Sequence, residues 1–385
     1  MKRDTAIQVL QYLESNQSNM ITFLENLVKL ETPSRDALAQ QAILQLLKKE
    51  FEKIKYKVFL MPGKKTGGFL YARPLEKKWK NPVQLVLGHC DTVWKKNTLE
   101  EMPVKHLNSK ISGPGVFDMK AGLTQIVFAL KAVKELNLST EVTPVVLINS
   151  DEEIGSLEST NTIKKIAKIA NRAFVLEPPY GMEGKLKTAR KGVGRFTIKV
   201  RGKTAHAGLN PSEGASAIME LSHHIQYLFS LNDVKSGITV NVGLIEGGTS
   251  ANVVAAESKA VIDVRVKNEE DAKLITAKIL GIKPVNKNII VEIEGAIKRP
   301  PMKKTQRNET LWKIAKNIGE LLQINLEDAS VGGGSDGNTT SMFTATLDGL
   351  GTVGDGAHTK HEFIYSNKLV ERTALVTLLL LADSV

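Results

Sequence analysis

The sequence has little cysteine, few aromatic residues and no long apolar run, and these scarcities exclude several classes of protein. One cysteine in 385 residues cannot build a disulfide framework or a cysteine-rich zinc module. The longest apolar-rich stretch, 374–382, is too short to span a bilayer. The N-terminus lacks the apolar segment of a secretory signal. We therefore expect a soluble, cytoplasmic protein with no membrane partner.

Positive charge is in excess but is not concentrated in one segment. The chain has 52 Lys and Arg against 41 Asp and Glu, a formal net charge of +11. Lysine pairs are scattered, and no basic motif with interleaved aromatic residues is present. Net charge influences association rather than fold. We expect no nucleic-acid partner and a solvated basic surface suited to anionic small molecules.

The rest of the composition is that of a folded globular protein. Hydrophobic residues make up 42% and charged residues 24% of the chain, with 30 Gly and 13 Pro, which argues against a disordered or fibrous chain. The length predicts roughly two to three domains. It also provides enough apolar material for a large core.

Helix and strand patterns alternate in the first half of the chain. Apolar positions recur at helical spacing in 5–30 and 36–53, and 119–136 is predicted as a helix with Asp118 at its N-cap. Buried strands are predicted at 83–89, 143–150 and 173–177. This alternation predicts an α/β fold, with a mostly parallel sheet and helices on both faces.

The pattern changes after residue 187 and changes back near residue 299. The segment between has the order strand, helix, strand, strand, helix, strand, which is typical of a ferredoxin-like domain. Its elements are predicted at 195–202, 212–231, 238–248, 258–267, 269–281 and 288–296. We therefore expect a catalytic domain of residues 1–187 and 299–385, interrupted by an inserted domain of residues 188–298.

Acidic and histidine side chains gather where the predicted strands end, which is where ligands bind in open α/β sheets. They are His89, Asp91, Asp118, Glu152, Glu153 and Glu177, followed by His358 after a Gly-rich turn. Histidines and carboxylates without a thiolate suit Zn²⁺, with Co²⁺ or Mn²⁺ as alternatives. If one carboxylate is shared, the set supplies ligands for two ions, the plan of two-metal hydrolases.

These residues also have ordinary structural interpretations. His89 can be a simple hydrogen-bonded histidine, Asp118 can cap a helix, and Glu152 and Glu153 can lie on a solvated turn. In the functional interpretation, one of the two adjacent glutamates binds metal and the other moves protons. Cys90 faces away from its neighbours along the strand and is expected to pack into the core.

Nine motifs in unbroken order resemble those of the M20 metallopeptidases, especially the glutamate carboxypeptidase branch. The family includes acetylornithine deacetylase and succinyl-diaminopimelate desuccinylase. The motifs, between about residues 80 and 365, are LVLGHCDTV, GPGVFDMKAG, NSDEEIGS, VLEPP, GKTAHAG, GGTSANVV, DVR, GGGSDGN and GDGAHTKHE. No single motif is sufficient, but the shared order is specific.

The resemblance implies a role for each strand-end residue. Two Zn²⁺ ions per chain would be bound, one by His89, Asp118 and Glu177 and the other by Asp118, Glu153 and His358. Asp118 would bridge them, Asp91 would orient His89, and Glu152 would be the general base. The family pattern also implies a cis peptide bond after Asp118.

The resemblance further implies that the inserted domain is a lid and dimerisation domain, so that we expect a homodimer. His206 would reach the active site of a neighbouring subunit and stabilise the oxyanion. The substrate-binding positions would be Asn252, Arg265, Lys185, Arg299, Gly333 and Ser335. The turn that carries Gly333 lacks GK[ST] and is not a Walker phosphate loop; a plain structural turn is the alternative.

The other histidines carry less weight. His361 lies near His358 and could compete as a ligand, but the motif favours His358. His106 has no supporting context, and His223 and His224 are expected on an exposed helix face.

The sequence therefore predicts a two-zinc hydrolase that cleaves an amide bond next to a free carboxylate. A carboxypeptidase that releases C-terminal glutamate from small peptides or N-acyl amino acids fits best. Alternatives in the family are an aminoacylase, a dipeptidase or an N-acyl-amino-acid deacylase similar to acetylornithine deacetylase. An inactive binding protein on the same fold is the alternative from another class.

Overall fold

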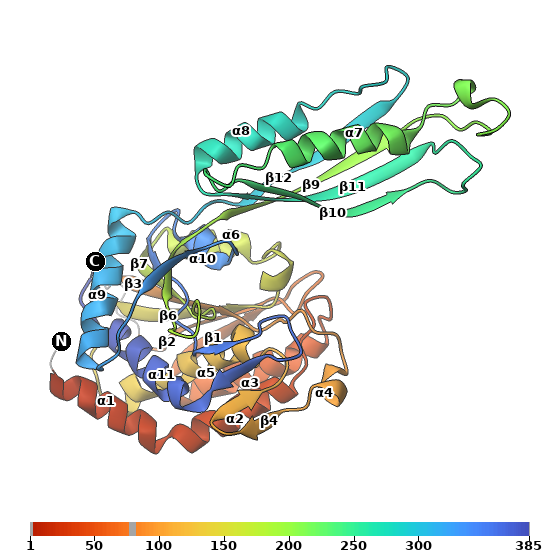
Figure 1. Ribbon diagram of the computed structural model, residues 1–385. Coiled ribbons are helices and arrows are strands. Elements are labelled where there is room, and N and C mark those ends of the chain that lie inside the picture. Colours follow the sequence, from red (N-terminus) through yellow and green to blue (C-terminus); the bar gives the residue numbers. More distant parts are fainter. Residues whose placement is uncertain (1–2, 77–81, 385) are drawn as a thin grey trace. The chain divides into compact units, whose positions relative to one another are not determined.

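The structure, a computed structural model, describes residues 3–76 and 82–384 (Figure 1). The chain divides into two compact units, each with an apolar core of its own. The first unit consists of Met1–Ala189, Lys304–Val331 and Ser335–Val385, and the second of Arg190–Lys303 and Gly332–Gly334. No helix of the described residues is long and apolar enough to cross a membrane.

A six-stranded sheet forms the centre of the first unit. In spatial order its strands are β1 (Tyr56–Met61), β2 (Phe69–Pro74), β6 (Thr143–Asn149), β3 (Val83–His89), β7 (Ala170–Val175) and β14 (Ala345–Leu347). The last four are parallel to one another, whereas β1 and β2 pair antiparallel. Every residue of β3 and β6 is buried, which explains their continuous apolar sequences.

Helices cover both faces of this sheet (Figure 1). They are α1 (Arg3–Ser15), α2 (Gln17–Lys29), α3 (Ala39–Lys53), α5 (Ala121–Glu135), α6 (Thr160–Ala167), α9 (Gln306–Leu321), α10 (Asp336–Thr340) and α11 (Ser366–Leu381), with a short α4 (Thr98–Glu101) in a loop. Side chains alternate along a strand. Val86 of β3 therefore packs in the core that contains α5 and α11, while Leu85 and Leu87 pack with Ile163 of α6. The predicted α/β sheet is confirmed.

Two smaller sheets also belong to the first unit. One contains β15 (Gly354–Asp355), β16 (Phe363–Tyr365), β5 (Lys110–Ser112) and β4 (Lys105–Leu107), and the other β13 (Asp328–Val331) and β8 (Leu186–Arg190). Strand β16 pairs with β5 so that Phe363 lies opposite Ser112. This pairing brings the segment before β16 next to the segment after β5, and both segments carry candidate site residues.

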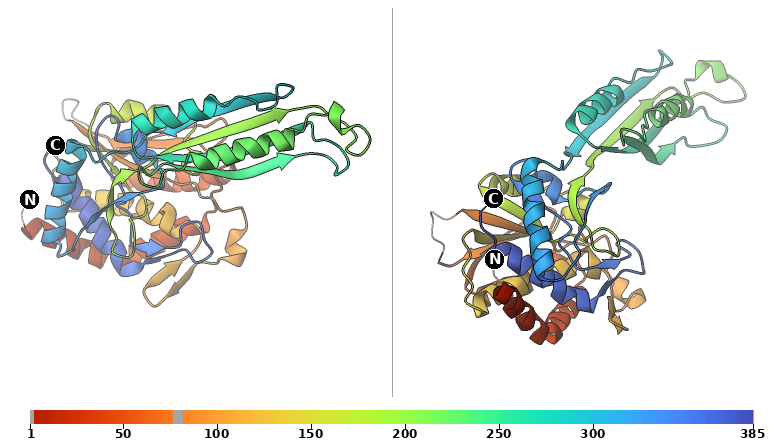
Figure 2. Two further views of the ribbon diagram at one scale, coloured as in Figure 1. Left: turned by 45° about the horizontal axis from the view of Figure 1, so that its top comes forward. Right: turned by 60° about the vertical axis from the view of Figure 1, so that its left-hand side comes forward.

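The second unit is an antiparallel sheet with helices on one face (Figure 1, Figure 2). In spatial order its strands are β10 (Thr239–Gly247), β11 (Glu257–Val266), β9 (Gly192–Arg201) and β12 (Ile290–Arg299). Helices α7 (Ala217–Ser230) and α8 (Glu269–Leu280) pack against them. Buried and more exposed residues alternate along β11, because one face of the sheet is covered and the other is not. The predicted order of strands and helices is confirmed.

Two local predictions are wrong. Helix α5 begins at Ala121, and Asp118 lies in a non-helical turn before it and does not cap it. The N–H of Asp118 is instead donated to a buried carboxylate, that of Glu362. His223 is exposed as expected, but His224 is buried, with its Nε2 3.0 Å from the carboxylate of the equally buried Glu220 one helical turn earlier.

Candidate metal centre

Three of the predicted residues meet at the imidazole of His89. The Nε2 atom of His89 lies 3.2 Å from Oδ1 of Asp118 and 3.4 Å from Oε1 of Glu177. His89 ends β3, Glu177 follows β7, and Asp118 lies in the turn Val116–Lys120 before α5. Strands β3 and β7 are adjacent and parallel, so their carboxyl ends deliver side chains to the same edge of the sheet.

The other carboxylate oxygen of Asp118 faces a second histidine. The Nε2 atom of His358 lies 3.4 Å from Oδ2 of Asp118 and 3.2 Å from Oε2 of Glu153. His358 is in the loop between β15 and β16, and Glu153 is in the turn Glu152–Ile154 after β6. Asp118 therefore lies between two groups, each with one histidine and one further carboxylate.

The donor atoms and their burial fit divalent cations. Ligand atoms of His89, Asp118 and Glu153 lie within 4.8 Å of one another, and so do those of His89, Glu152 and Glu177. Within the described residues, Oε1 of Glu153 is buried and has no hydrogen-bond partner. A buried carboxylate oxygen without a partner is costly unless a cation or a proton compensates it. Imidazole and carboxylate ligands without thiolate suit Zn²⁺, Co²⁺ or Mn²⁺.

The orientation of the His89 ring is fixed at its other nitrogen. Nδ1 lies 3.0 Å from the main-chain oxygen of Asp91 and 3.4 Å from the Asp91 carboxylate. A hydrogen bond donated by Nδ1 leaves Nε2 unprotonated in the neutral ring, which is the form that binds a metal. Of the two Asp91 groups near His89, the main-chain oxygen is therefore the closer one and orients the ring.

The Asp91 side chain holds the turn that carries the two glutamates. Its carboxylate accepts the hydroxyl of Ser34 at 2.7 Å and the backbone N–H groups of Glu152 and Glu153, both at 3.1 Å. Asp91 is fully buried. A single aspartate therefore positions both the first histidine and the adjacent glutamate pair.

Burial and close charges shift the proton affinities of the cluster. Burial raises the pKa of Glu153 and of Glu177, and the negative charge of Asp118 raises both further. Burial opposes ionisation of Asp118, but hydrogen bonds from His358 and His89 lower the pKa of Asp118 overall. Hydrogen bonds to Asp118 and Glu153 raise the pKa of His358 to about 10. A divalent cation must displace the retained protons, so its affinity is expected to fall as the pH is lowered.

The turn of Asp118 is held by a residue that the sequence did not single out. The carboxylate of Glu362 accepts the backbone N–H groups of Gly115, Phe117 and Asp118 at 2.9, 2.9 and 3.0 Å. The Asp118–Met119 peptide bond is cis, as the resemblance implies. The signal for Glu362 in the sequence is its place at the end of the GDGAHTKHE motif, which says nothing about its contacts.

His206 lies on an exposed loop of the second unit. Its Nδ1 accepts the backbone N–H groups of Gly208 and Leu209 at 3.1 and 3.2 Å. In the neutral ring the proton is therefore on Nε2, which is available as a donor. The catalytic role of His206 stays a prediction.

The other predicted substrate-binding residues of the second unit are on strands and loops. Arg265 donates two hydrogen bonds to the Asp263 carboxylate, at 2.8 and 3.0 Å. Asn252 is exposed, and its side-chain oxygen accepts the hydroxyl of Ser250. Arg299 is the last residue of β12 and is half-buried. Their contacts with substrate stay predictions.

The remaining three predicted residues have mainly structural contacts. Lys185 forms an ion pair with Glu327 at 2.7 Å, and the main-chain oxygen of Gly333 accepts a hydrogen bond from Arg190 at 3.1 Å. The Ser335 hydroxyl is buried; it caps α10 and donates to Asp348. A role for Lys185, Gly333 or Ser335 in substrate binding stays a prediction.

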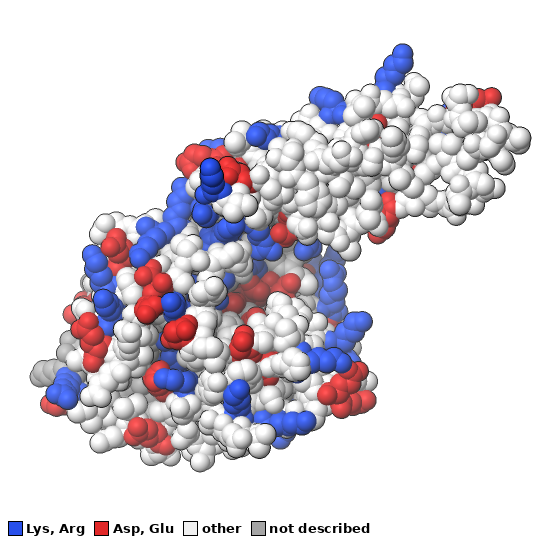
Figure 3. All heavy atoms as spheres, viewed as in Figure 1, with Lys and Arg blue, Asp and Glu red and all other residues white. Residues whose placement is uncertain are grey.

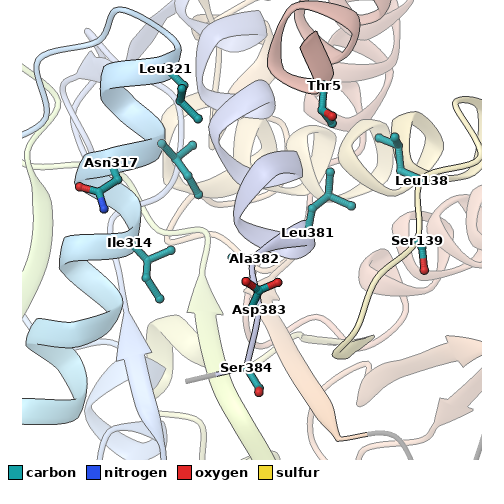
Figure 4. Close-up of a pocket in the computed structure, with 11 residues that line it drawn as sticks. Thr5, Leu138, Ser139, Ile314, Asn317, Leu321, Leu381, Ala382, Asp383 and Ser384 are labelled. Carbon is teal, nitrogen blue, oxygen red and sulfur yellow. The ribbon is translucent and has the colours of Figure 1, made fainter. Parts of the chain in front are cut away.

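A cavity of about 700 Å³ elsewhere in the first unit has a different character (Figure 4). Apolar side chains such as Ile314 and Leu321 of α9 and Leu381 of α11 line it. Its lining, as far as the structure describes it, includes one acidic residue, Asp383, and no histidine. A single carboxylate without a histidine does not make a metal centre. On the face shown in Figure 3, basic and acidic side chains are interspersed over the first unit.

Comparisons with known proteins agree with this architecture. A family model, M20_dimer, described as a peptidase dimerisation domain, matches residues 188–282. Carboxypeptidase G2 of Pseudomonas sp. (strain RS-16) is 27% identical over 391 residues, which cover 99% of this chain and 92% of that relative.

Solved structures share the fold. Aminopeptidase PepT from Bacillus cereus ATCC 10987 has a TM-score of 0.75 and 24% identity, and the match covers 95% of this chain and 98% of that one. The YXEP protein of Bacillus subtilis, described as a dinuclear metal binding peptidase of the M20 family, has a TM-score of 0.69 and 14% identity, covering 96% of this chain and 98% of that one.

The two groups around Asp118 predict how substitutions change the metal content. If each group holds one divalent ion, His358→Ala should remove one ion and Asp118→Ala both, because His358 belongs to one group and Asp118 to both. Metal analysis after equilibrium dialysis against Zn²⁺ measures this. The matched control is His361→Ala, three residues further along, which should retain both ions. Two ions in His358→Ala, or a loss in His361→Ala, would contradict the prediction.

Proposed function

We propose that this chain is a two-zinc carboxypeptidase of the M20 metallopeptidase family, which releases C-terminal glutamate from small peptides or N-acyl amino acids. One observation carries the proposal: the two oxygens of the Asp118 carboxylate face two different histidines. A carboxylate in this arrangement is suited to bridge two cations. The relative from Bacillus subtilis that is described as dinuclear supports the same reading.

In this proposal the ligands form two sets that share Asp118. One set is His89, Asp118 and Glu177, and the other is Asp118, Glu153 and His358. The ions would polarise the scissile carbonyl and lower the pKa of the attacking water. His89 would bind through Nε2, because its Nδ1 is engaged by Asp91. Co²⁺ or Mn²⁺ would suit the same ligands.

Glu152 is the proposed general base. Its carboxylate lies within 4.8 Å of ligand atoms of His89 and Glu177. Glu152 is therefore at the site, whereas its neighbour Glu153 is the glutamate that contacts His358. Asp91 fixes the backbone of Glu152 and its neighbour Glu153. Glu152 would accept the proton of the attacking water at a carboxylate oxygen and pass it to the leaving amine.

The second unit is proposed to be a lid and dimerisation domain, in a homodimer that works in the cytoplasm. The match of residues 188–282 to a peptidase dimerisation domain supports this. We propose that His206 donates its Nε2–H to the oxyanion in the active site of a neighbouring subunit. Its two backbone donors at Nδ1 support this role, because they leave Nε2 as the donor atom.

Carboxypeptidase and aminopeptidase activities differ in which charged end of the substrate is recognised. The net charge of +11 favours recognition of a substrate carboxylate. Similarity to carboxypeptidase G2 over 99% of the chain points the same way. Arg265, Asn252, Lys185 and Arg299 are the proposed contacts, together with Gly333 and Ser335. Arg265 suits bidentate binding, although a substrate carboxylate would compete with Asp263.

Glu152→Gln should abolish most of the activity while the metal content stays near two ions per chain. An amide keeps the size of the side chain but cannot accept the proton, and general base catalysis is worth about 10²- to 10⁴-fold in kcat. Steady-state kinetics and metal analysis of the same preparation test this. Glu100→Gln, on the exposed surface of α4, is the matched control. Full activity of Glu152→Gln would remove the residue from this role.

His206→Ala should lower kcat by about 10²- to 10³-fold and leave both ions bound, because it removes an oxyanion donor. His223→Ala, an exposed histidine of the same unit, is the control and should keep full activity. Mixing inactive His206→Ala chains with inactive Glu152→Gln chains should restore part of the activity. If subunits exchange and no activity returns, His206 does not act across subunits.

The substrate is tested by comparing kcat/KM over four small compounds: an N-acyl-glutamate, an N-acyl-leucine, an N-acyl-ornithine and a dipeptide with a free amino group. We expect the N-acyl-glutamate to be the best substrate, with no activity after chelation of the metal. Preference for the leucine or ornithine compound would favour an aminoacylase or deacylase, and preference for the free dipeptide a dipeptidase. No turnover in the metal-loaded protein would favour an inactive binding protein.

A further inference from the structure

The carboxylate of Glu362 joins three chain segments near the candidate ligands. Its Oε1 accepts the N–H groups of Phe117 and Asp118 at 2.9 and 3.0 Å. Its Oε2 accepts the N–H of Gly115 at 2.9 Å and the indole N–H of Trp94 at 3.0 Å. Each oxygen thus accepts two hydrogen bonds, which fills the acceptor sites of a carboxylate. The side chain is fully buried.

Glu362 and His358 belong to one hydrogen-bonded loop. Within it, the N–H of Thr359 is donated to the main-chain oxygen of Gly356 at 2.9 Å, and the N–H of Glu362 to that of Thr359 at 3.1 Å. The side chain of His358 is 51% exposed, so that packing against other side chains restrains the imidazole little and its position depends on the loop. The Glu362 carboxylate therefore links the loop of His358 to the turn of Asp118.

The turn of Asp118 also has internal hydrogen bonds that do not involve Glu362. The N–H of Val116 is donated to Gly113 at 3.2 Å, and that of Lys120 to Gly115 at 2.9 Å. His89, at the end of a fully buried strand, is held independently. Without the Glu362 carboxylate the turn of Asp118 keeps part of its hydrogen bonding and His89 keeps all of its contacts. Loss of the carboxylate should therefore displace the His358 loop more than it displaces His89 or Asp118.

We propose that Glu362 is a positioning residue that sets the distance between the His358 imidazole and the Asp118 carboxylate. It would thereby determine the affinity of one metal position, the one formed by Asp118, Glu153 and His358, and affect the other position little. This inference rests on the two-metal function proposed above. It goes beyond that function because it assigns the difference in affinity between the two metal positions to a residue that belongs to neither ligand set.

The test compares the two metal affinities in Glu362→Gln. The amide nitrogen replaces an oxygen that accepts two hydrogen bonds, so two buried N–H groups then face a donor. Metal-free protein is titrated with Co²⁺ in competition with a chelator and followed by visible absorption. We expect one binding step to weaken by about 10- to 100-fold, as for other residues that orient metal ligands. The weakened step should be the one that His358→Ala lacks.

Two further variants make the result decisive. Glu362→Asp keeps the charge but shortens the side chain; it should weaken the same step less, and it decides the matter if Glu362→Gln does not fold. Glu220→Gln is the matched control, since Glu220 is a buried carboxylate of the second unit that accepts the N–H groups of Val285 and Asn286 at 2.6 and 3.0 Å. It should keep both steps.

Equal weakening of both steps in a folded Glu362 variant, or of neither, overturns the inference. The first result would mean that Glu362 only stabilises the fold around the site. The second would mean that the His358 loop is positioned by other contacts. A wild-type protein that binds fewer than two Co²⁺ ions would instead contradict the proposed two-metal function.

Discussion

The central constraint of this structure is a buried cluster of carboxylates that share two histidines. Asp118 has one oxygen toward His89 and the other toward His358, and a second carboxylate accompanies each histidine. Like charges at this spacing in a buried site repel one another, and only protons, histidine cations or metal ions offset the repulsion. The fold offsets part of this cost, because hydrogen bonds to the backbone hold the turns that carry several of these side chains.

Two buried carboxylates, those of Asp91 and Glu362, accept most of these hydrogen bonds from backbone N–H groups. Asp91 accepts the N–H groups of the turn that carries Glu152 and Glu153, and Glu362 accepts those of the turn that carries Asp118. Charge-assisted hydrogen bonds to backbone are short and directional. They restrain the loops, so that ligands on loops can meet a ligand at the end of the buried strand β3.

Much of the fold and of the candidate site could be predicted from the sequence. The buried strand at 83–89 and the order of elements between residues 188 and 298 are visible as patterns of apolar residues. Side-chain contacts that join distant segments are not visible in this way. His224 of α7 was expected to be exposed, but it is buried within the second unit. Asp118 resembled a helix cap, but its N–H is donated to the carboxylate of Glu362, 244 residues later.

Apolar periodicity and motif order are local properties of the chain, and they were enough to predict which residue types stand at the ends of the strands. The same patterns do not reveal that Asp118 faces both histidines, that the Asp91 carboxylate holds the turn of Glu152 and Glu153, or that Glu362 binds the turn of Asp118. Those outcomes depend on the pairing of strands and on buried hydrogen bonds between segments far apart in the chain, where each N–H must find an acceptor and no local pattern specifies which one it finds.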